Sequence, residues 1–197
     1  MKKIIAAFDG LKYSSATSQY AINLAKQTNT HLVGLFMDDP TNTSYKIYEV
    51  ITNEGVSGER LNEMEAADKA TRKIASQNFE KACQEKGLEY TIHHDRNFAL
   101  QEVKHESIYA DLLIIDSSET LTHYPENLPT RFIRNLLSDV QCPVLLVPQK
   151  YNPIQKIILL YDGEPSAVHA VKMFSYILPQ LKHLETEVIT VNPVASS

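Results

Sequence analysis

Two aspartates stand where short apolar runs end, and these residues are the best placed in the sequence to do chemistry. Asp9 follows the run at 2–8, and Asp116 ends the run at 111–116. In doubly wound parallel sheets, ligands bind beyond the carboxyl ends of the strands, where the strand order reverses. If the two runs are neighbouring strands, their carboxylates share a crevice suited to a ribose hydroxyl, another polar ligand or a metal. The alternative is that each carboxylate accepts a backbone N–H in the turn that follows it.

The segment 116–130 occupies the place of a phosphate-binding loop. Such a loop needs glycines, because their backbone N–H groups must approach the anion closely. This segment has no glycine, two prolines and three acidic residues: Asp116, Glu119 and Glu126. The negative charge of these acidic residues and the stiff backbone at the prolines argue against binding of a nucleotide triphosphate. Thr130 is the remaining candidate for holding one anionic group, although a plain helix N-cap is the more common role for such a threonine.

Other chemical motifs are weak. The sequence contains no GxSxG, HExxH, GxxxxGK[ST] or GxGxxG pattern. His93 and His94 are adjacent, so a strand would direct them to opposite faces, which is poor geometry for one metal ion. Cys83 and Cys142 form no CxxC pair, and we expect Cys142 to pack as a small apolar residue. A metal-assisted hydrolase stays open as an alternative, because two aspartates are a minimal Mg²⁺ site.

Strands and helices alternate along the chain. Five apolar runs predict strands at 2–8, 31–37, 88–94, 111–116 and 143–147, with helices at 14–27, 59–86, 98–109 and 130–140. The helix at 59–86 has an apolar face that includes Ile74 and Phe79, and Gly87 is its predicted terminator. Residues 41–58 are polar and predict a loop. Because the strands are apolar throughout, both faces of their sheet must be covered, which is typical of a parallel α/β sheet.

An internal repeat divides the chain. The segment KIIAAFDG at 3–10 recurs as KIILLYDG at 156–163, and each copy is followed by a helical stretch, another strand and a proline. We therefore expect a complete domain at 1–150 and an incomplete second copy, one βαβ unit, at 151–197. The second copy is too short to hold a core alone. We expect a fragment of a tandem protein of roughly 280 residues, about two such units.

Composition excludes several classes of protein. The 197 residues carry 19 basic and 24 acidic side chains, a net charge of −5, with no basic cluster for nucleic acid or an anionic membrane. No apolar run approaches the ~20 residues that span a bilayer. The amino terminus lacks the pattern of a signal peptide, and two distant cysteines form no disulfide framework. A cytoplasmic location is the simplest expectation.

Three segments resemble the universal stress protein family. They are the opening strand into Asp9 and Gly10 with serines soon after, the segment ADLLII at 110–115, and the closing CPVLLVP at 142–148. The resemblance covers residues 2–148 as a whole domain and 155–193 as the first third of another. It implies a doubly wound five-stranded parallel sheet in the order 3-2-1-4-5, of the adenine nucleotide alpha hydrolase-like type. It also implies dimeric or tandem association and a cytoplasmic, stress-associated role.

The resemblance also bears on ligand binding. In ATP-binding members, an aspartate at the place of Asp9 approaches the nucleoside, and the loop after the fourth strand carries spaced glycines followed by a hydroxyl residue. Here Asp116, Glu119 and Thr122 fall near the glycine positions, and Thr130 falls at the hydroxyl. The resemblance therefore implies the subgroup that does not bind ATP. Asp9, Asp116 and Thr130 remain the residues of a candidate pocket, with no catalytic residue and no metal ligand assigned.

These observations lead to one expected function and one alternative. We expect a non-enzymatic stress-response module without a cofactor, acting through protein association or through sensing of a small ligand. Its expected partners are a second copy of the chain or its own tandem domain, and a protein still to be identified, with no nucleic acid and no membrane. The alternative is a binder of ATP or AMP, or a slow ATP hydrolase, whose site lies in a complete second domain.

Overall fold

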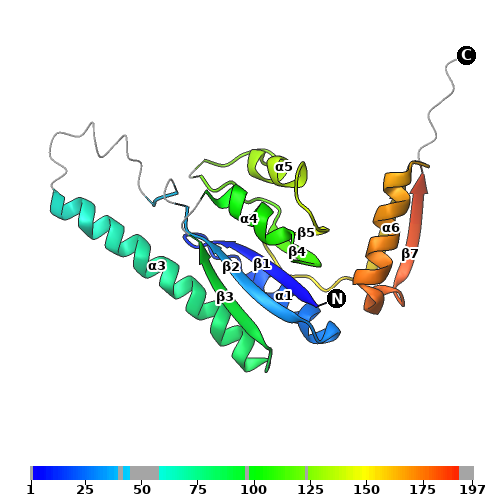
Figure 1. Ribbon diagram of the computed structural model, residues 1–197, viewed down its shortest axis with the longest axis horizontal. Coiled ribbons are helices and arrows are strands. Elements are labelled where there is room, and N and C mark those ends of the chain that lie inside the picture. Colours follow the sequence, from blue (N-terminus) through cyan, green and yellow to red (C-terminus); the bar gives the residue numbers. More distant parts are fainter. Residues whose placement is uncertain (1, 40–41, 45–57, 96–97, 123, 191–197) are drawn as a thin grey trace, which may run out of the picture. The chain divides into compact units, whose positions relative to one another are not determined.

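The computed structural model describes residues 2–39, 42–44, 58–95, 98–122 and 124–190 (Figure 1). The predicted loop at 41–58 lies almost wholly outside the described residues, as do the two prolines of the repeat. The chain divides into two compact units between Tyr151 and Asn152. The first unit contains β1 (Lys3–Asp9), α1 (Ser15–Thr28), β2 (His31–Met37), α3 (Gly58–Glu85), β3 (Tyr90–Asp95), α4 (Ala99–Ser107), β4 (Leu112–Asp116), α5 (Arg131–Leu137) and β5 (Val144–Val147).

The five strands of the first unit form one parallel sheet in the order β3-β2-β1-β4-β5. The predicted order is thus confirmed, and β1 and β4 are neighbours, with Ile4 opposite Leu112. The chain first adds strands on one side of β1 and then crosses to the other side. The strand order therefore reverses between β1 and β4, and a ligand crevice is expected at their carboxyl ends.

Helices cover both faces of this sheet, which explains why its strands are apolar throughout. Helices α1 and α3 lie on one face, and α4 and α5 lie on the other (Figure 1). Successive residues of β1 point to opposite faces of the sheet. Ile5 and Ala7 belong to the core that includes α4 and α5, while Phe8 stacks with Phe36 and meets Phe79 of α3. Cys142 packs into the first of these cores, as predicted.

The helix ends follow from local chemistry. Ser14 caps α1, because its side chain accepts the N–H of Thr17. Gly87 has a φ of 64° just after α3, a conformation that glycine adopts without strain, so the predicted terminator is confirmed. The predicted apolar face of α3 is partly wrong. Its buried face runs through Ala75, Phe79 and Cys83, while Ile74 is 56% exposed, because one helical step turns Ile74 about 100° away from Ala75.

The second unit is a single βαβ unit of β6 (Lys156–Tyr161), α6 (Pro165–Ile177), a short 3-10 helix (Pro179–Leu181) and β7 (Glu185–Thr190). Its two strands are parallel, and Lys156 lies within 3.0 Å of Glu185 and 2.9 Å of Glu187. Ile157 is buried, but Ile158 and Leu160 are 54% and 72% exposed. Successive side chains of β6 point to opposite faces of this two-stranded sheet, so Ile158 and Leu160 lie on the face away from Ile157.

Candidate functional site

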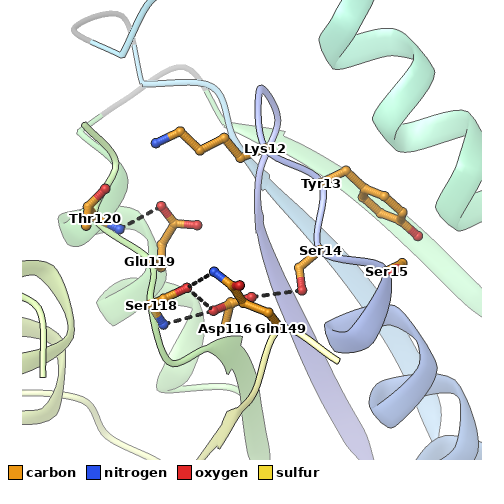
Figure 2. A pocket seen from close by; sticks show the side chains of 9 residues that line it. All are labelled: Lys12, Tyr13, Ser14, Ser15, Asp116, Ser118, Glu119, Thr120 and Gln149. Carbon is orange, nitrogen blue, oxygen red and sulfur yellow. Dashed lines mark hydrogen bonds between the residues drawn. The ribbon is translucent and has the colours of Figure 1, made fainter. Parts of the chain in front are cut away.

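A polar pocket of about 330 Å³ lies at the carboxyl ends of β1 and β4, within the first unit (Figure 2). The segment after β1 contributes one wall, and the segment after β4 contributes the opposite wall. The end of β5 adds Gln149. The lining residues are mostly hydroxyl-bearing or charged: Lys12, Tyr13, Ser14, Ser15, Asp116, Ser118, Glu119, Thr120 and Gln149. The sheet's reversal point therefore carries the pocket, as the topology predicts.

Asp116 lines this pocket, but hydrogen bonds within the chain already occupy its carboxylate. One oxygen, Oδ1, accepts the N–H of Ser118 at 2.8 Å and the hydroxyl of Ser118 at 2.6 Å. The other, Oδ2, accepts the hydroxyl of Ser14 at 3.1 Å. Only 9% of the residue is exposed. Asp116 thus fixes the two pocket walls to each other, and it also makes the turn that the alternative interpretation described.

Asp9 lies beneath the pocket and has no solvent exposure. Its Oδ1 accepts the backbone N–H of Leu11 at 2.8 Å and the side-chain amide of Asn42 at 3.0 Å. Its Oδ2 is also buried, and no hydrogen-bond donor for it exists among the described residues. The strands that end in Asp9 and Asp116 are neighbours, but Asp9 is absent from the pocket lining.

Thr130 is fully buried at the start of α5. Its hydroxyl accepts the N–H of Ile133 at 3.2 Å, which is an N-cap, and donates to the carbonyl oxygen of Glu119. It is not among the pocket-lining residues. Of the three residues predicted for the candidate pocket, the structure therefore places one in the lining, one beneath it and one behind the loop.

Glu119 is one of the eight lining residues that sequence reasoning did not select as site residues. It is 8% exposed, and its Oε1 accepts the N–H groups of Thr120 at 2.9 Å and Leu121 at 2.8 Å. Burial, and next the negative charge of Asp9, raise the pKa of Glu119 to about 7. The feature of the sequence that could have pointed to Glu119 is an acidic residue near a position where ATP-binding relatives have glycine.

Metal ligation has little support in the described residues. They contain no group of three or more histidine, cysteine, aspartate or glutamate side chains able to hold an ion. His93 and His94 point to different partners, as predicted: His93 lies 3.4 Å from Glu106, and His94 lies 3.1 Å from Asp38. Within the described part of the chain, no helix is both long and apolar enough to cross a membrane.

A doubly wound parallel sheet with a pocket at its reversal point defines a Rossmann-like α/β domain. The sequence model of the universal stress protein family matches residues 1–148, and the chain belongs to this family. The predicted family and fold class are thus confirmed. No curated protein sequence matches the chain.

Solved structures of the family share the fold. A universal stress protein from Archaeoglobus fulgidus DSM 4304 is 14% identical with a TM-score of 0.61, covering 99% of this chain and 67% of its own. Universal stress protein UspA from Lactobacillus plantarum is 13% identical with a TM-score of 0.53, covering 74% of this chain and 97% of its own. A universal stress protein in complex with cAMP is 13% identical with a TM-score of 0.50, covering 76% and 98%.

Proposed function

We propose that the first unit is a non-enzymatic module of the stress response, acting through protein association or through a small polar ligand, and that its own pocket does not bind ATP. We further propose a cytoplasmic location and pairing with a second copy or with a tandem domain. The proposal follows from family membership together with the chemistry of the pocket at the ends of β1 and β4.

One observation carries the argument against ATP. The N–H groups of Thr120 and Leu121 lie in the loop where a phosphate would be held, and the carboxylate of Glu119 already occupies both. A phosphate would have to displace this internal carboxyl group and would then meet the carboxylate of Asp116 as well. In addition, Leu121 has a φ of 50°, so a side chain stands at a backbone conformation that glycine adopts most easily.

The pocket and its surroundings suit other ligands better. Serine hydroxyls, the Gln149 amide and Lys12 can bond neutral hydroxyl or amide groups, and the volume is at the small end of the about 300–1,000 Å³ typical of ligand sites. Beside the pocket, Tyr124 and Leu128 are 62% and 64% exposed and line a wider groove. Exposed aromatic and aliphatic side chains together support association with a protein.

Titration calorimetry of the purified protein with ATP, ADP and AMP tests the proposal. We expect no binding tighter than millimolar in the presence or absence of Mg²⁺. The family member that was solved with cAMP, titrated with cAMP, is the positive control. Binding of any of the three nucleotides tighter than millimolar, weakened by Ser14→Ala or Gln149→Ala in the pocket, overturns the proposal.

The second unit favours the alternative of adenine-nucleotide binding through one observation. Asp162 repeats one hydrogen bond of Asp9: its Oδ1 accepts the N–H of Glu164 at 2.9 Å, as Oδ1 of Asp9 accepts that of Leu11 at 2.8 Å. Protein purified from its own cells and then denatured tests this alternative. Released adenine nucleotide that is absent from an Asp162→Ala variant supports it, and a preparation without nucleotide counts against it.

A further inference from the structure

The buried oxygen Oδ2 of Asp9 is an unexplained feature of the site. Burying a carboxylate oxygen without a donor is costly, so such atoms normally have a partner or lie next to a proton. Asp9 has no exposed surface, and its other oxygen already accepts two hydrogen bonds. Something other than those two donors must satisfy Oδ2.

Glu119 is the group placed to supply that proton. Glu119 follows the end of β4 by three residues, β4 lies beside the strand that ends in Asp9, and both side chains are buried at this edge of the sheet. The loop fixes Glu119 through its Oε1, and Figure 2 shows its second oxygen pointing away from Thr120, toward the segment after β1. We propose that Asp9 and Glu119 share one proton, which a neutral Glu119 donates to Oδ2 of Asp9.

The charged groups around Asp9 and Glu119 are compatible with a proton shared between the two carboxyl groups. Lys12, from the segment after β1, lowers the pKa of Glu119, but its ammonium group donates to the carbonyl of Thr122. Asp116, at the end of β4, adds a further negative charge, and its oxygens are taken by Ser14 and Ser118. From α5, Arg131 has an exposed side chain.

The other groups that face the pocket have little effect on the charge balance around Asp9 and Glu119. Tyr13 is the remaining titratable side chain in the lining, and burial raises its pKa, so it stays neutral. Asn42, after β2, donates to the other oxygen of Asp9 and carries no charge. Arg72 of α3 is a second cation on this side, since its guanidinium would lie 3.4 Å from a Cβ atom at Gly10, next to Asp9. It donates to the carbonyl oxygens of Met37 and Asn42 and to Asp38, so it is bonded elsewhere, as Lys12 is.

The shared proton makes the loop after β4 sensitive to pH. Because burial and Asp9 raise the pKa of Glu119 from 4.5 to about 7, the folded protein keeps a proton that the unfolded chain releases. This stabilisation is fully present below pH 4.5 and is lost as pH rises through 7. Above that value, two buried negative charges repel each other, which weakens the packing of the loop that carries Glu119.

Carbon-13 NMR of the glutamate carboxyl groups tests the pair directly in the whole protein. We expect one glutamate to titrate near pH 7, and Glu119→Gln identifies it by removing that signal. In Asp9→Asn, the amide keeps the bonds of Oδ1 and places an N–H at the position of Oδ2, so the midpoint of Glu119 falls by about one pH unit or more. Titration of Glu119 below pH 5 in the wild type overturns the proposal. A midpoint near 7 that Asp9→Asn leaves in place also overturns it, since burial alone then accounts for the shift.

Thermal unfolding between pH 4.5 and pH 8.5 gives an independent check. The melting temperature of the wild type is expected to fall across this range more steeply than that of Glu119→Gln, whose amide permanently mimics the protonated acid. Glu65→Gln removes an exposed carboxyl group of α3 and is the matched control, expected to keep the wild-type slope. Equal slopes for the wild type and Glu119→Gln contradict the shared proton, and poor folding of Glu119→Gln leaves the NMR comparison with Asp9→Asn to decide.

Discussion

Ser14 and Asp116 are 102 residues apart in the sequence, yet the hydroxyl of Ser14 donates to Oδ2 of Asp116 at 3.1 Å. The same hydroxyl accepts the N–H of Thr17 at 3.2 Å and caps α1. One serine therefore starts a helix on one side of the pocket and bonds the end of β4 on the other. The two walls of the pocket are held together at this point (Figure 2).

Replacing Ser14 with alanine is expected to destabilise the protein by about 1–2 kcal/mol, because it removes an N-cap and leaves a carboxylate oxygen without its donor. Urea unfolding followed by circular dichroism measures the change. Ser15, the exposed first residue of α1, provides the control, and Ser15→Ala should stay within about 0.5 kcal/mol of the wild type. Equal losses in the two variants would show that the contact with Asp116 contributes nothing.

Gly34 gives a second prediction, on the packing of α3 against β2. A Cβ atom at Gly34 would lie 2.5 Å from the ring of Phe79, which is fully buried. Gly34→Ala is therefore expected to destabilise the fold by about 1–3 kcal/mol through overpacking. Gly58 at the start of α3 has open space around it, so Gly58→Ala is the control and should not destabilise. An unchanged urea midpoint for Gly34→Ala would contradict this packing.

The two cysteines give a third prediction. Both are buried and free, and burial raises the pKa of Cys83 to about 12 and that of Cys142 to about 11. Because the thiolate is the reactive form, neither thiol should react with DTNB in the folded protein at neutral pH. Unfolding in guanidinium should release two reactive thiols. Reaction of either thiol in the native protein at the rate of a free cysteine would contradict the burial.

Asp111 gives a fourth prediction, on acid stability. Its carboxylate accepts the N–H groups of Lys2 at 2.6 Å and Lys3 at 2.9 Å, which ties the start of β1 to β4. Burial raises the pKa of Asp111, but these two bonds together with nearby positive charge, including that of Lys2, outweigh it, and the pKa lies below its usual value. A lowered pKa stabilises the fold above the unfolded value of 3.8, and this contribution is lost as pH falls through the folded value.

Asp111→Asn should therefore be less stable than the wild type at pH 7, and the difference should shrink as pH falls below 3.8. Chemical unfolding at a series of pH values measures it. Asp139→Asn, which changes a carboxylate that is 68% exposed, is the control and should show a small difference at every pH. A difference for Asp111→Asn that does not vary with pH would contradict a role for its charge.

Much of the fold could be predicted because each part has a local cause. Strands such as Ile4–Phe8 are apolar on both sides, and that pattern occurs where helices cover both faces of a parallel sheet. Ser14, Gly87 and Thr130 are of residue types that start or end helices, and each does so. The exposure of Ile74 was not predicted. The spacing of apolar residues shows which residues share a face of a helix, but not which face packs against the sheet.

The family, and through it the strand order, can be predicted from residue pattern alone, and so can the lack of glycine between Asp116 and Thr130. Which carboxyl groups are buried around the pocket depends on tertiary contacts that the sequence pattern does not reveal. The fold places Asp9 beneath the pocket and Glu119 within it, and one buried oxygen of Asp9 has no donor in the described part of the chain. The physical reason is that burial and the neighbouring charge set the protonation of a carboxyl group, and both arise from residues distant in sequence.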